Sequence, residues 1–181
     1  MAIKSDAKAY GLIARALHWS IAILILGMIA TGYLADDVKA VIPLHKATGI
    51  LVLTLSGLRL LWWLLDSTRP GDDELHWEKW PARLAKWSLA TLGLVMPLSG
   101  WLMSSAADKP ISFFGVFTVP SLLAADKELA GLFKEAHETL ALALCLVLAA
   151  HVLGALRHQF WIRDGVLGRM LPWLMAEPAG K

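Results

Sequence analysis

The sequence predicts an all-α integral membrane protein, a four-helix bundle formed by a single domain over residues 1–181, with both termini in the cytoplasm. Hydrophobic residues make up 57% of the chain, against about half in ordinary soluble domains. Four apolar segments are each long enough to cross a bilayer, which takes about 20 residues. Nine tryptophans suit a chain that meets two lipid–water boundaries, where this residue is enriched.

The four predicted spans cover residues 17–35, 41–65, 84–103 and 137–156. Basic residues precede the first span, as they would precede a secretory signal. However, its apolar run is long and no small-residue cleavage site follows it, so we expect a retained helix. The third span contains Pro97, which a membrane helix tolerates where neighbouring helices satisfy the freed carbonyl.

The connections between the spans differ in character. Residues 35–43, ADDVKAVIP, form a short outer turn. Residues 66–81, DSTRPGDDELHWEKWP, are polar and contain Pro-Gly, which predicts a solvated inner linker. Residues 104–136 are longer, and their apolar centre, ISFFGVFTVPSLL, is interrupted by glycine and proline. We expect this centre to form a flap over the outer face of the bundle.

Basic residues are distributed unevenly between the two sides. The side with both termini and the inner linker carries twelve of them, including all seven arginines, whereas the opposite side carries five. Cytoplasmic segments of membrane proteins are enriched in lysine and arginine. The charge distribution therefore predicts that the N- and C-termini are both cytoplasmic.

Four histidines within the predicted spans fall into two pairs by depth. His137 and His151 are fourteen residues apart, which is ~21 Å of rise and nearly four whole turns, so both lie on one helix face. His45 follows Pro43 at the outer end of the second span, level with His137. His18 lies about 27 Å below the outer boundary, level with His151.

Two such pairs suit the axial ligation of haem iron. Imidazole is a strong axial ligand, and cofactor sites in helix bundles are built from side chains on facing helices. We therefore predict one haem between His45 and His137 and a second between His18 and His151. The C-x-x-C-H motif of covalent attachment is absent from the chain, so both haems would be non-covalent b-type groups.

Two alternative roles for the four histidines fit the pattern less well. Unrelated histidines, each satisfied by hydrogen bonds, would not be expected to share two depths, and intramembrane ionisable residues are functional candidates by default. A zinc or di-iron site would need carboxylates or cysteines close to the histidines at one depth. Only Glu138 lies beside one of the pairs.

Four stretches of the chain resemble the prokaryotic cytochrome b561 family and, within it, the diheme superoxide oxidases. They are RALHWSIAILILGMIATGY, LHKATGILVLTLSGLRLLWW, PLSGWLMSSA and AHETLALALCLVLAAHVLGALRHQFWIRDGVLGRMLP. Together they cover nearly the whole chain in order. The resemblance implies a multi-pass protein of the bacterial inner membrane, with two b haems held by His18, His45, His137 and His151.

The chain departs from the family pattern at one position. Many members have a histidine eleven residues before the proline of the third helix, where this chain has Lys86. This departure leaves the four ligands intact, but a quinone site near Lys86 does not follow from the resemblance.

Two basic residues extend the candidate site. Arg157 can face the propionates of the inner haem or serve as a positive-inside anchor, and Lys46 can pair with an outer propionate, attract an anion or snorkel.

The resemblance also implies an oxidoreductase that exchanges electrons with the quinone pool. We expect superoxide or another one-electron donor to reduce the protein from outside and ubiquinone to accept the electrons, with membrane lipid but no nucleic acid as a further partner. The alternative function is an electron-transfer subunit that anchors a larger dehydrogenase or hydrogenase. A membrane protein without haem, with a purely structural role, is a third possibility.

Overall fold

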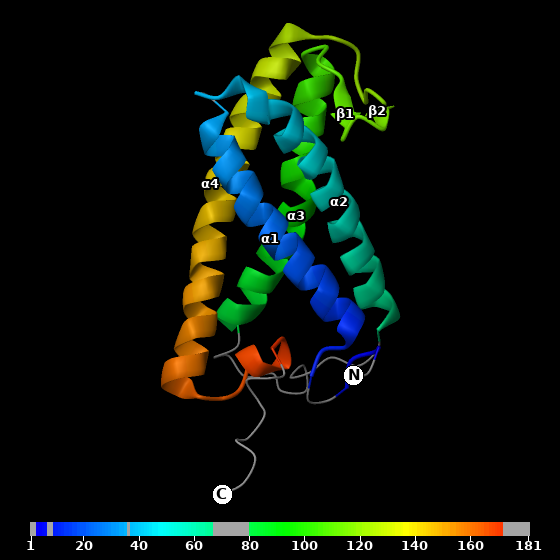
Figure 1. Cartoon of the computed structure of the whole chain (residues 1–181). Coiled ribbons are helices and arrows are strands. Elements are labelled where there is room, and N and C mark those ends of the chain that lie inside the picture. Colours follow the sequence, from blue (N-terminus) through cyan, green and yellow to red (C-terminus); the bar gives the residue numbers. More distant parts are fainter. Residues whose placement is uncertain (1–2, 7–8, 36, 67–79, 172–181) are drawn as a thin grey trace, which may run out of the picture.

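The computed structural model describes residues 3–6, 9–35, 37–66 and 80–171. Within these ranges, four long helices form a bundle (Figure 1). They are α1 (Leu12–Leu34), α2 (Ile42–Leu65), α3 (Trp80–Ala106) and α4 (Lys127–Arg157). By length and composition, all four can cross a membrane. The four-helix membrane bundle predicted from the sequence is confirmed.

Short elements lie at both ends of the bundle. At one end, η1 (Lys39–Val41) joins α1 to α2, and the strands β1 (Ile111–Phe113) and β2 (Phe117–Val119) form an antiparallel hairpin between α3 and α4. At the other end, η3 (His158–Ile162) and η4 (Leu167–Arg169) follow α4. Most of the predicted inner linker, with Arg69, His76 and Lys79, lies outside the described residues.

Helix α4 is longer than the sequence predicted and begins ten residues before the expected span. The carboxylate of Asp126 accepts hydrogen bonds from the backbone N–H groups of Glu128 and Leu129, at 2.9 and 3.1 Å. Such an N-cap satisfies donors that have no partner in the first turn. The last part of the stretch expected to be a loop is therefore helical, and it extends α4 about 15 Å beyond His137.

The helices pack in chain order, α1 against α2, α2 against α3 and α3 against α4. Leu92, Met96 and Leu144 form the buried core between α3 and α4. Leu144 lies seven residues from each α4 histidine, so this core is an apolar layer midway between the two histidine levels. Much of the remaining apolar surface is exposed, as a helix surface in contact with lipid requires.

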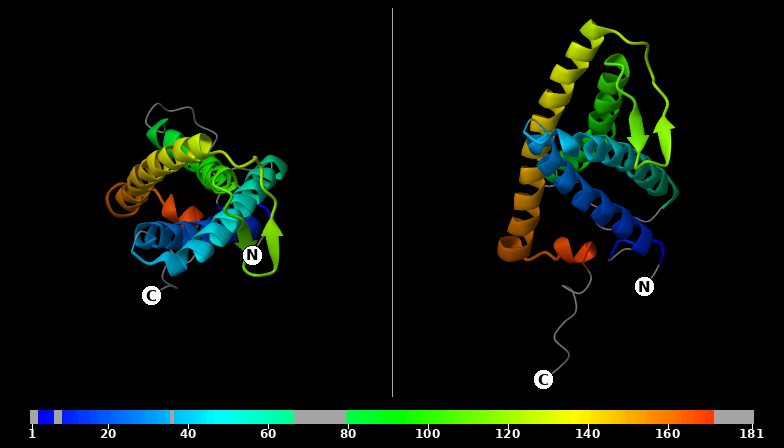
Figure 2. Two further views of the ribbon diagram at one scale, coloured as in Figure 1. Left: turned by 90° about the horizontal axis from the view of Figure 1, so that it is seen from above. Right: turned by 45° about the horizontal axis from the view of Figure 1, so that its top comes forward.

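The predicted flap is the β1–β2 hairpin, which packs on α2. Ile111 and Val119 are buried, whereas Phe114, Val116 and Phe117 near the turn are exposed. The turn places Phe114 and Gly115 in the left-handed region, with φ of 50° and 79°, a conformation that favours glycine. Seen from above, the turn lies at the edge of the bundle beside α2 (Figure 2).

The N-terminal segment folds under the ends of the helices opposite the hairpin, which are called the inner ends below, whereas the hairpin end is called the outer end. The hydroxyl of Ser5 donates to the carboxylate of Asp66 at 2.6 Å and accepts from the N–H of Gly11 at 3.1 Å. The N–H of Tyr10 donates to the carbonyl of Arg169 at 3.1 Å. These bonds place the described N-terminal residues and the segment after α4 at the same end of the bundle (Figure 1).

We predict that Gly11→Ala destabilises this inner end. A Cβ at residue 11 would lie 2.4 Å from the carbonyl oxygen of Ile3, so the N-terminal segment must move. Overpacking of this kind costs about 1–3 kcal/mol, and the Tm of the protein in detergent should fall. Gly57→Ala is the control, because a Cβ there meets nothing within 4 Å. Equal Tm values for the two variants would contradict the prediction.

Candidate cofactor site

His45 of α2 and His137 of α4 face each other in the outer half of the bundle. Their ring centroids are 6.4 Å apart and their planes are inclined at 75°. A bond between a metal and an imidazole nitrogen is about 2.0–2.1 Å long, so a metal held between two imidazoles sets the ring centroids roughly 6 Å apart. This outer pair therefore has the spacing that axial ligation of one iron requires.

A hydroxyl group of α1 fixes the ring of His45. Thr31 Oγ1 lies 3.0 Å from His45 Nδ1 and donates its own proton to the backbone carbonyls of Gly27 and Met28. Because the single hydroxyl proton can go to these carbonyls, Thr31 can accept a hydrogen bond from His45 when the ring is in its Nδ1–H form. The lone pair of the imidazole then lies on Nε2, the nitrogen that is left to bind a metal.

A hydroxyl group of α3 holds His137 in the same way. Ser99 Oγ lies 2.9 Å from His137 Nδ1 and donates to the carbonyl of Met96 at 2.7 Å. The Met96 carbonyl also accepts a hydrogen bond from the His137 ring. As for His45, the contact with Ser99 suits the ring form that carries the proton on Nδ1. All four helices thus contribute to the outer pair, two with imidazoles and two with hydroxyls.

A glycine follows each of these hydroxyl residues and lies beside the ring. A Cβ at Gly32 would stand 3.4 Å from Cε1 of His45, and a Cβ at Gly100 would stand 3.0 Å from Cε1 of His137. The absence of a side chain lets each imidazole approach the backbone of the neighbouring helix. Gly32 and Gly100 therefore form a cradle that a larger residue would fill.

His18 of α1 and His151 of α4 form the inner pair. The two side chains interact electrostatically, and Arg59 of α2 interacts with both. The ring of His18 also packs edge-on against Trp19, with centroids 5.2 Å apart. Among the described residues, neither imidazole of the inner pair has a hydrogen-bond partner. The inner pair thus faces a guanidinium where the outer pair contacts hydroxyls.

The donor set of the described chain fits haem rather than a bare metal ion. No group of three or more histidine, cysteine, aspartate or glutamate side chains in the described ranges could hold such an ion. Each histidine pair instead supplies two imidazoles from facing helices, which is what a macrocyclic cofactor leaves for the protein to provide.

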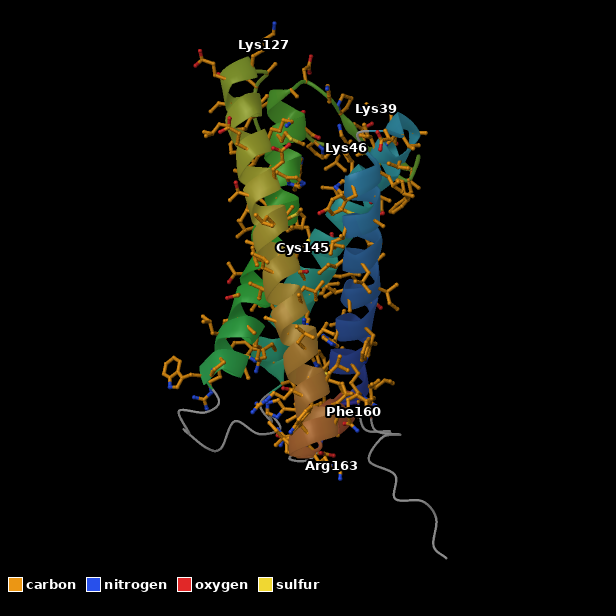
Figure 3. All side chains as sticks on the ribbon, turned by 90° about the vertical axis from the view of Figure 1, so that its left-hand side faces the viewer. Lys39, Lys46, Lys127, Cys145, Phe160 and Arg163 are labelled. Atoms are coloured by element: carbon orange, nitrogen blue, oxygen red, sulfur yellow. The ribbon has the colours of Figure 1, made fainter. Side chains whose placement is uncertain are left out.

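The two predicted basic residues lie at opposite ends of the bundle. Lys46 is half-buried beside His45, and its Nζ donates to the carbonyl of Lys109 at 3.4 Å. Figure 3 shows Lys46 near the outer end and Arg163 at the inner end. Arg157 is exposed in the last turn of α4. It has no hydrogen bond or ion pair with the described residues.

His158 pairs with Asp164 and takes no part in either histidine pair. Nδ1 of His158 lies 2.6 Å from Oδ2 of Asp164, while Oδ1 accepts from the N–H of Val166 at 3.2 Å. Burial raises the pKa of Asp164, but hydrogen bonds from His158 and Val166 outweigh burial and hold this pKa below its usual value. Asp164 thus stabilises a turn of the chain.

Comparisons with known proteins agree with this geometry. The family model described as prokaryotic cytochrome b561 matches residues 9–173. The chain is 33% identical over 180 residues to cytochrome b561 homolog 2 of Escherichia coli (strain K12), covering 94% of this chain and 95% of that protein. It is 28% identical over 169 residues to cytochrome b561 homolog 1 of the same organism, covering 86% and 93%.

We predict that Gly100→Ala weakens haem binding at the outer pair. The new Cβ would press on the ring of His137. Disturbing the residues that orient a metal ligand typically lowers the affinity for the metal by roughly 10–100-fold. The haem-to-protein ratio after purification should fall. Gly154→Ala, on α4, is the matched control, since a Cβ there meets nothing within 4 Å. The same haem content in both variants would rule out the cradle.

Proposed function

The chain belongs to the prokaryotic cytochrome b561 family, and on this premise we propose that it is a diheme superoxide:ubiquinone oxidoreductase of the bacterial inner membrane. The family implies a b-type haem and electron transfer in the membrane. The observation that best supports the diheme proposal is the geometry of the outer pair. The ring centroids of His45 and His137 have the spacing that binding of one iron requires, and each Nδ1 contacts a hydroxyl.

The four histidines would hold two haems. In the Nδ1–H form, His45 of α2 and His137 of α4 would offer Nε2 at the outer level, and His18 of α1 and His151 of α4 would hold the second haem at the inner level. When bound in this way, a b-type haem supplies one-electron oxidation and reduction. With two histidines of the chain holding each haem, a donor or acceptor would bind to protein residues beside the group rather than to the iron.

The residues around the outer pair suit a small anionic donor. Lys46 stands one residue from a ligand, and its ammonium group interacts with that of Lys109. Positive charge at this end attracts an anion such as superoxide, which loses one electron and leaves as dioxygen. A lipid quinone would take two electrons and two protons. Two haems allow the electrons from two donor molecules to be collected for one quinone.

We place both termini of the chain in the cytoplasm. The described N-terminal residues and the segment after α4 share one end of the bundle, where Arg163 and Arg169 also lie. Enrichment of basic residues marks the cytoplasmic side. The hairpin end, with Lys46 and Lys109, would then face the periplasm, which is where superoxide arriving from outside would meet the protein.

We predict two haems per chain, which individual histidine variants separate. A pyridine haemochrome assay should return two b haems, and the optical spectrum should be that of six-coordinate, low-spin iron. His45→Ala or His137→Ala should remove the outer haem alone, and His18→Ala or His151→Ala the inner haem alone. If His18→Ala and His137→Ala abolished the same redox component, the pairing by depth would be wrong. A colourless preparation from haem-replete cells would reject the function as a whole.

We predict that superoxide reduces the oxidised protein at a salt-sensitive rate. Exposed charges are screened over about 10 Å at 0.1 M salt, and steering of this kind changes rates by roughly tenfold or more. Stopped-flow reduction should slow as ionic strength rises and in Lys46→Glu. Lys127→Glu is the control, because Lys127 lies at the far outer end of α4 (Figure 3) and should have little effect.

The superoxide experiment also separates the candidate functions. If superoxide reduced the protein no faster than it dismutes spontaneously, the oxidase function would be rejected. The electron-transfer subunit of a larger dehydrogenase or hydrogenase would then be the better proposal. Fast reduction that is indifferent to salt and to Lys46→Glu would keep the oxidase function and remove only the role of the lysine.

A further inference from the structure

The surroundings of the two histidine pairs differ in a way that affects electron transfer. At the outer pair, Nδ1 of His45 and of His137 lies within 3.0 and 2.9 Å of a hydroxyl oxygen. At the inner pair, no hydrogen bond to a described residue holds either ring, and the positive charge of Arg59 acts on both. The asymmetry arises from side chains on three helices, α1, α2 and α3.

Each contact shifts the redox equilibrium of a bound iron in a known direction. An acceptor at Nδ1–H makes the imidazole a more basic ligand, and a more basic ligand stabilises ferric over ferrous iron, which lowers the reduction potential. A nearby positive charge favours the less positive, reduced state, which raises the potential. The outer site is thus biased towards giving up an electron and the inner site towards keeping one.

We propose that Thr31 and Ser99 are positioning residues that hold His45 and His137 in the Nδ1–H form and set the outer haem at a lower reduction potential than the inner haem. Electrons that enter at the outer end then run energetically downhill to the inner end. This inference rests on the proposed binding of two haems. It adds to that function a direction of electron flow that is encoded in side chains outside the ligand set.

The two hydroxyls are not equivalent. The ring of His137 has a second acceptor, the Met96 carbonyl, whereas the hydroxyl of Thr31 is the hydrogen-bond partner of the His45 ring within the described residues. Removing the Thr31 hydroxyl therefore leaves Nδ1–H of His45 without an acceptor, while removing the Ser99 hydroxyl leaves the carbonyl in place. The effect on the outer haem should be larger for Thr31→Val than for Ser99→Ala.

The test is spectroelectrochemical measurement of both midpoint potentials in the purified protein, with the component lost in His45→Ala identified as the outer haem. In Thr31→Val the ratio of oxidised to reduced outer haem at a fixed potential should fall about tenfold. For a one-electron couple, this corresponds to a rise of about 59 mV in the midpoint potential of the outer haem. The inner potential should stay unchanged. Thr31→Ser, which keeps the hydroxyl, should behave as the wild type.

Thr54→Val is the matched control. The hydroxyl of Thr54 also donates to a carbonyl of its own helix, that of Ile50 at 2.9 Å, but it is exposed and contacts no histidine. This variant should move neither potential. Equal movement of both potentials in Thr31→Val, or movement in Thr54→Val of the same size, would assign the effect to general disturbance of the helices and overturn the proposal.

The remaining outcomes separate this inference from the function on which it rests. If Thr31→Val loses the outer haem while Thr31→Ser keeps it, Thr31 positions the ligand. The midpoint potential of the outer haem in Ser99→Ala then tests the inference, and it should show the smaller positive shift. Two bound haems with the outer potential at or above the inner one in the wild type would reject the inference and leave the proposed function intact. Fewer than two haems in the wild type would reject the proposed function itself.

Discussion

The spacing of two histidines along α4 is the constraint on which the rest of the arrangement depends. Fourteen residues bring His137 and His151 to one face of the helix, so both pairs must form on the same side of α4. His45 of α2 then faces His137 at one end of the bundle, and His18 of α1 pairs with His151 at the other. Helix α3 carries no histidine, but it packs closely on α4 and brings Ser99 and Gly100 to the ring of His137.

An imidazole among apolar helices needs a partner for each of its polar atoms, because an unsatisfied buried group costs about 1–3 kcal/mol. The outer pair meets this requirement at Nδ1 across helix boundaries, with Thr31 contacting His45 and Ser99 contacting His137. Both hydroxyls also donate to carbonyls of their own helices, so their orientation is fixed before any cofactor binds. The site is therefore pre-organised by its hydrogen bonds.

The sequence was sufficient to predict the four membrane helices and which histidines lie near each other, because apolar length and helical rise are local properties. The start of α4 was missed, although the Asp126 cap is a local signal. Thr31 and Ser99 were missed for a different reason. Each precedes a glycine, but so do Thr48 and Ser56, and which of these dipeptides faces a histidine depends on the rotation of one helix against another, which a single sequence does not contain.

The apolar layer of Leu92, Met96 and Leu144 has a consequence for the membrane as a barrier. The three side chains are apolar and supply no hydrogen-bonding group to a proton path between α3 and α4, whereas electrons tunnel through such material. With cofactors above and below this layer, electron transfer between the two levels would carry charge across part of the membrane. Each transfer would then be coupled to the membrane potential, at about 2.3 kcal/mol per charge for 100 mV across the full thickness.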